Sequence, residues 1–79
     1  MVFDLSKLRG RIKEQFGSEK AFAEAMDVTP SWLSARLNGK IQFDSDEIYL
    51  AAQLLNISDE EIGAYFFKPK FDKIEQEGV

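Results

Sequence analysis

The sequence predicts a compact all-α domain of five helices, followed by a short extended C-terminal tail. Apolar residues recur at spacings of three and four along most of the chain, which is typical of helices with one buried face. Residues that favour helix N-termini stand in front of each apolar group. The 79 residues include no cysteine, so packing alone has to hold one small core together. We therefore expect one domain over residues 1–67 and a tail over residues 68–79.

Two helices are predicted in the first third of the chain. Asp4 can cap the first helix and Gly17 can end it. Ser18 can cap the second helix. The apolar face of the first helix consists of Leu5, Leu8, Ile12 and Phe16, and that of the second consists of Phe22, Ala23 and Met26.

A third helix is predicted from residue 30 to residue 38. Thr29 supplies a capping oxygen, and Pro30 fits the first helical position because no backbone N–H is needed there. Asn38 and Gly39 stop the helix. Its inward-facing residues are Leu33 and Leu37.

The fourth and fifth helices are predicted from two capping signals. Asp44 and Glu47 have the spacing of a capping box, and so do Ser58 and Glu61. Asn56 can close the fourth helix in a left-handed conformation. The buried face of the fourth helix consists of Ile48, Ala51, Ala52 and Leu55, and the short fifth helix contains Ile62. We expect an extended backbone from residue 65 onward.

The composition argues against an enzyme and against a bound metal or cofactor. Histidine and cysteine are absent, which removes the commonest metal ligands and the commonest general base. The acidic groups at residues 44–47 and 59–61 fall in the first turns of predicted helices, where they complement the helix dipole. There is neither a membrane-length apolar run nor a signal-peptide pattern, so a cytoplasmic location is expected.

Charge is distributed unevenly along the chain. The net charge is -4, but residues 1–40 carry +2 and residues 41–79 carry -6. An acidic protein is a poor match for nucleic acid as a whole, so any surface that faces DNA is expected in the first half. The outer face of the predicted helix 30–38 could form such a surface. With Leu33 pointing inward, helical geometry directs Ser31, Trp32, Ala35 and Asn38 away from the core.

The segment 18–40, SEKAFAEAMDVTPSWLSARLNGK, resembles the helix-turn-helix of the Cro and repressor (Xre-type) superfamily of DNA-binding regulators. The residues that carry the resemblance are Ala23, Val28, Thr29, Leu33, Asn38, Gly39 and Lys40. The similarity extends over residues 4–64, and both ends of that region resemble small Cro-like regulators of temperate phages of Gram-positive bacteria. It implies a lambda-repressor-like fold and a homodimeric transcriptional regulator, a repressor in a bacterial host cell.

The resemblance also implies roles for individual residues. Helix 30–38 would read double-stranded operator DNA in the major groove. The base-reading positions correspond to Ser31, Trp32 and Ala35, with Pro30 and Ser34 beside them. The phosphate-contacting positions correspond to Ser18, Asn38 and Lys40, and Lys20 would compensate for the carboxylate of Glu19 next to phosphate.

Two residues of this helix have competing interpretations. Arg36 is predicted to contact DNA, because arginine makes the commonest specific base contact. Alternatively, it pairs with a neighbouring carboxylate. Trp32 is predicted to make an exposed interaction, and its alternative is a position folded back over Phe43 as peripheral core.

The aromatic residues near the C-terminus predict a dimer interface. Tyr65, Phe66, Phe67 and Phe71 offer more aromatic surface than so small a domain readily buries. Some of these rings would complete the core of the monomer, and the rest would suit a two-fold interface. Two functional hypotheses follow from the whole sequence. The first is a sequence-specific DNA-binding regulator. The alternative is a protein-binding modulator of a partner repressor, which the acidic second half, Glu19, an exposed Trp32 and the aromatic tail favour.

Overall fold

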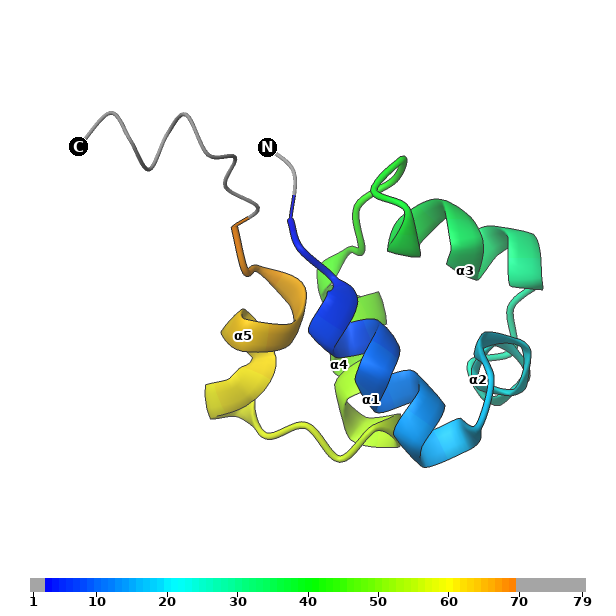
Figure 1. The fold of residues 1–79 in the computed structure, drawn as a ribbon, viewed down its shortest axis with the longest axis horizontal. Helices are drawn as coiled ribbons and strands as arrows, with labels where there is room; N and C mark the ends of the chain where they lie inside the picture. The colour runs from blue at the N-terminus through cyan, green and yellow to red at the C-terminus, as the bar shows by residue number, and fades with distance from the viewer. Residues whose placement is uncertain (1–2, 70–79) are drawn as a thin grey trace.

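The computed structural model describes residues 3–69 and confirms an all-α fold with five helices (Figure 1). The helices are α1 (Ser6–Phe16), α2 (Glu19–Ala25), α3 (Pro30–Leu37), α4 (Ser45–Leu54) and α5 (Ile62–Phe66). A single 3-10 turn, η1 (Asp59–Glu61), leads into α5. In Figure 1, α2 and α3 lie on one side of α1, and α5 lies on the other side. Within residues 3–69, no helix is both long and apolar enough to cross a membrane.

The predicted caps account for most helix boundaries. The hydroxyl of Ser18 accepts a hydrogen bond from the Ala21 amide at 3.1 Å, and Gly17 ends α1 with a φ of 84°. Asp44 and Glu47 form both hydrogen bonds of a capping box at the start of α4. Helix α1 differs slightly from expectation. Asp4 accepts a hydrogen bond from the Ser6 amide, but the helix begins only at Ser6, with Leu5 at the N-cap position.

Helix α1 crosses the middle of the core and contacts both α2 and α5. Leu8 and Ile12 of α1 are almost completely buried. The other buried apolar residues are Phe22, Ala23, Met26, Leu33, Leu37, Ile48, Ala51, Ala52, Leu55, Ile57, Tyr65 and Phe66. This set contains every inward-facing residue predicted for the second, third and fourth helices. The described chain therefore folds around one apolar core, as the helical periodicity indicates.

The start of the tail is a correction to the sequence prediction. Tyr65 and Phe66 were expected in an extended segment and at a dimer interface, but they belong to α5 and pack into the core. Ile62, Tyr65 and Phe66 share one face at helical spacing, which outweighs the strand preference of aromatic residues. Phe71 and the rest of residues 70–79 lie outside the described residues.

The two ends of the described chain meet. The amide of Asp4 donates a hydrogen bond to the carbonyl of Lys68 at 2.8 Å, and Phe3 forms an isolated antiparallel bridge with Pro69. The rings of Phe3 and Phe67 meet edge to face, 5.5 Å apart. Residues 68 and 69, which were predicted to leave the domain as a tail, therefore lie against its first residues.

The N-cap of α3 is expected to contribute measurably to stability. The hydroxyl of Thr29 accepts a hydrogen bond from the Trp32 amide at 3.1 Å. We expect Thr29→Ala to lower the free energy of unfolding by about 1 kcal/mol, because that amide loses its partner. Thr29→Ser keeps the oxygen and should remain close to the wild type in a urea titration followed by circular dichroism. Equal losses in both variants would show that the hydroxyl is not the stabilising group.

Candidate functional site

The candidate site is the surface of α3 together with the loop that joins it to α4. Leu33 and Leu37 anchor α3 in the core, and Val28 packs against the core from the turn before it. The residues that α3 and its C-terminal end leave exposed are Pro30, Ser31, Ser34 and Asn38. These four belong to the residues predicted to contact DNA. Ala35, another predicted base-reading residue, is only partly exposed.

Trp32 folds back onto the domain. Its ring lies 6.3 Å from that of Phe43 in an edge-to-face arrangement, and Phe43 meets Phe66 in the same way at 5.4 Å. This series of aromatic contacts connects Trp32 to the core, and its side chain is partly buried. The structure thus shows the alternative arrangement, in which Trp32 covers Phe43. The prediction that Trp32 points freely away from the core was wrong.

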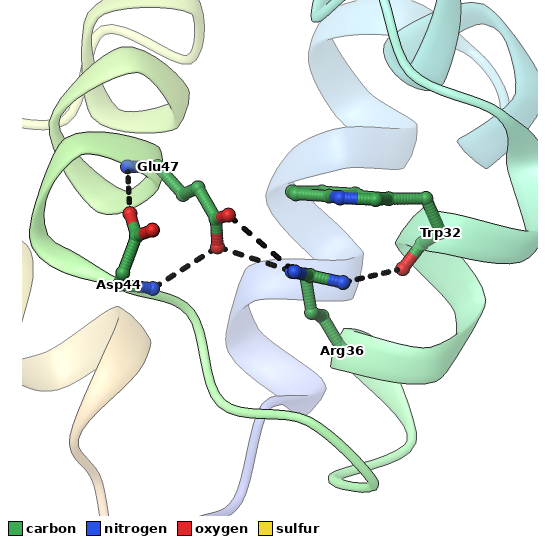
Figure 2. Close-up of polar contacts among 4 residues, drawn as sticks. All are labelled: Trp32, Arg36, Asp44 and Glu47. Atoms are coloured by element: carbon green, nitrogen blue, oxygen red, sulfur yellow. Dashed lines mark hydrogen bonds and ion pairs between the residues drawn. The ribbon is translucent and has the colours of Figure 1, made fainter.

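Arg36 is held by a carboxylate from α4 (Figure 2). Its Nε and Nη2 atoms donate to the two carboxylate oxygens of Glu47 at 3.0 and 3.4 Å. The guanidinium also lies over the indole of Trp32, with Cζ 3.7 Å from the ring centroid, and Nη1 reaches the Trp32 carbonyl oxygen at 3.5 Å. The Arg36 side chain is 13% exposed. Of the two interpretations of Arg36, the structure shows the pairing with a neighbouring carboxylate.

Glu47 was expected only as a capping residue, and its second role was missed. It does cap α4, since its Oε1 atom accepts the Asp44 amide hydrogen at 3.0 Å. The same oxygen also accepts from Arg36. The alternative that Arg36 pairs with a carboxylate was a signal for this contact. The sequence does not identify the partner, because Glu47 is eleven residues away on a different helix.

The predicted phosphate-contacting residues divide into two groups. Lys20 and Lys40 are exposed. Ser18 is engaged as the cap of α2, and Asn38 accepts a hydrogen bond from Arg9 at 2.7 Å. Arg9 also forms an ion pair with Glu19 at 2.8 Å. This ion pair provides the compensation for the Glu19 charge that was expected from Lys20.

Exposed apolar side chains lie in the loop after α3, on α4 and at the end of α5. Ile41 in the connecting loop and Phe67 after α5 line a pocket whose walls include Phe3, Phe43 and Ile48. Two further exposed apolar residues, Tyr49 and Leu50, lie on α4. Among the residues predicted to form a dimer interface, Phe67 is the one that the described chain leaves exposed, at 46%. Contiguous exposed apolar surface is typical of protein-binding sites, and Ile41 and Phe67 line the same pocket.

Comparison with known proteins finds a matching family and a similar solved structure. Residues 1–69 match a family model described as a protein of unknown function (DUF739). The fold is similar to the solution structure of the modulator of repression (MOR) of the temperate bacteriophage TP901-1 from Lactococcus lactis, with a TM-score of 0.77. The two chains are 36% identical, and the match covers 91% of this chain and 97% of the other. No curated protein matches the chain.

Proposed function

Since the chain belongs to the DUF739 family, and since it shares its fold and 36% of its residues with a phage modulator of repression, we propose that it modulates repression by binding a partner repressor protein. In this proposal the chain acts as a protein-binding module built on a fold of the repressor type. The exposed surface around α3 and α4 makes the contact. The predicted alternative function thereby takes precedence over direct reading of an operator.

The observation that carries this proposal is the ion pair between Arg36 and Glu47. Arg36 is the only charged residue of α3, and Glu47 neutralises it within the chain. DNA binding depends on cations that neutralise phosphates and on donors that reach base edges. With Arg36 engaged, α3 presents no charge to DNA. The net charge of -4 adds long-range repulsion of a polyanion.

Exposed apolar residues support a protein partner as well. Ile41, Phe67, Tyr49 and Leu50 are each at least 40% exposed. Aromatic and aliphatic side chains of this type form the centres of protein interfaces, where charged residues are depleted. A second protein would remove their apolar surface from water, whereas a DNA backbone would not.

Direct DNA binding is the second candidate function. It is favoured by the exposed N-terminal half of α3, where Pro30, Ser31 and Ser34 are open to solvent. Exposed Lys20 lies on α2 and exposed Lys40 follows α3, and both could contact phosphates. In this case a homodimer that includes Phe67 would place two copies of α3 on two half-sites.

Binding measurements with both classes of partner test the proposal. The labelled chain is titrated with the repressor encoded by the genome that carries its own gene. It is titrated separately with operator and scrambled duplexes, and all titrations are made at two salt concentrations. We expect saturable binding to the repressor and weak binding to either duplex. A tight, salt-sensitive preference for the operator, with no binding to the repressor, would contradict the proposal and establish the second candidate.

A further inference from the structure

Contacts at the start of α4 hold Glu47 in place independently of Arg36. It occupies the third position of α4, where its amide donates to the Asp44 carboxylate at 2.8 Å and its Oε1 atom accepts from the Asp44 amide at 3.0 Å. The Glu47 side chain is 21% exposed. Because the capping box fixes this carboxylate, Glu47 is preorganised to bind a cation from α3.

The guanidinium of Arg36 makes three hydrogen bonds within the chain. Its contacts are the Glu47 carboxylate, the Trp32 carbonyl and the face of the Trp32 ring. The edge formed by Nε and Nη2 already binds both carboxylate oxygens of Glu47, so a phosphate or a guanine can pair with that edge only by displacing Glu47. A complex in which DNA pairs with this edge must break the ion pair between Arg36 and Glu47. A protein partner that docks on apolar surface leaves that ion pair intact.

We propose that Glu47 is a specificity-determining residue, which excludes duplex DNA from α3 by holding Arg36 in an internal ion pair. This inference rests on the proposed protein-binding function and names the residue that decides between the two classes of partner. Removing the Glu47 charge would leave a largely desolvated guanidinium without its anion. Such a charge is strongly unfavourable, so the long Arg36 side chain would turn outward and pair with phosphate when DNA is present.

The chain provides a matched pair of variants for this test. Glu47→Gln keeps the length of the side chain and an oxygen that can accept the Asp44 amide hydrogen, so the cap of α4 is retained. Asp46→Asn removes the same charge from the same turn, and Asp46 is exposed and distinct from the Arg36 partner. The double variant Glu47→Gln with Arg36→Ala tests whether any gain depends on the arginine. Circular dichroism checks the helical content of all three.

The measurement is fluorescence anisotropy with a mixed-sequence duplex over a series of salt concentrations. We expect Glu47→Gln to bind the duplex about tenfold more tightly than the wild type, with a salt dependence steeper by about one released counterion. Asp46→Asn should stay within about twofold of the wild type, because screening weakens an exposed charge that contacts no ligand. Adding Arg36→Ala should abolish the gain. Equal affinities for Glu47→Gln and Asp46→Asn would overturn the role of Glu47.

A second measurement uses the wild-type chain and does not depend on the folding of a variant. The Arg36 Nε–H group should exchange slowly with water in a nuclear magnetic resonance experiment, because it is bonded to Glu47. Rapid exchange would overturn the proposal. Repressor binding by the wild type is measured alongside. A lack of repressor binding contradicts the proposed function alone. Equal duplex affinities of Glu47→Gln and Asp46→Asn contradict the role of Glu47 alone.

Discussion

Phe22→Ala is expected to remove about 3–5 kcal/mol of stability, because it leaves a cavity in the core of a small domain. Phe22 is 1% exposed, and its ring lies 5.2 Å from that of Phe16, so the substitution removes contacts between α1 and α2. A loss of this size is a large fraction of the total stability of a domain, which is about 5–15 kcal/mol. The variant should be partly unfolded at a denaturant concentration that the wild type tolerates.

Urea titration followed by circular dichroism measures this effect. The matched control is Tyr49→Ala, since Tyr49 is 59% exposed and its truncation should change the free energy of unfolding by no more than about 0.5 kcal/mol. A fall in the midpoint without a change in slope would assign the loss to the folded core. Similar stabilities of the two variants would contradict the placement of Phe22 at the centre of the core.

Arg11→Ala has the second largest expected effect on stability. The Nε atom of Arg11 donates to the carbonyl of Leu55 at 2.9 Å, and Nη2 donates to the carbonyl of Asn56 at 3.0 Å. These carbonyls lie at the C-terminal end of α4, where a cation also complements the helix dipole. We expect a loss of about 2 kcal/mol, because hydrogen bonds that involve a charged group are stronger than neutral ones.

Lys13→Ala is the matched control for Arg11→Ala. It removes one positive charge from the same helix at an exposed position. Thermal unfolding of the two variants should give a clearly lower midpoint for Arg11→Ala. If both variants lost the same amount, net charge would explain the effect and the two carbonyl contacts would contribute little.

The sequence predicts the helices well where local chemistry decides them. The oxygens of Ser18, Thr29 and Asp44 occupy the N-cap positions of α2, α3 and α4. Asn56 takes the left-handed conformation predicted for the end of the fourth helix, with a φ of 57°. These features depend on residues within one turn of each other, so the sequence pattern contains enough information to place them.

The candidate site is less predictable because its contacts depend on tertiary structure. Arg36 and Glu47 meet only when the start of α4 lies beside α3, and the series Trp32, Phe43 and Phe66 connects three elements. The sequence leaves both alternatives open for Trp32 and Arg36. Helical periodicity gives the direction of a side chain from its own helix but does not show which other helix covers it.

The fate of the aromatic residues near the C-terminus follows the same principle. The number of aromatic residues predicts that some of their rings remain exposed. In the structure Tyr65 and Phe66 of α5 are buried and Phe67 is exposed. Phe67 is the C-cap residue at which α5 ends, so its side chain leaves the face that buries Tyr65 and Phe66. Composition alone therefore cannot assign an interface in a chain of this size.

The bridge between Phe3 and Pro69 has a consequence for how this unit can be joined to other chains. The two ends of the described chain lie side by side. The described residues could therefore be inserted into a surface loop of a host protein without separating the two host segments that flank the insertion. The same proximity favours circular permutation, in which a short linker joins the two ends and a new opening is made elsewhere. Closing the ends in this way would also restrict the unfolded chain and so favour the folded state.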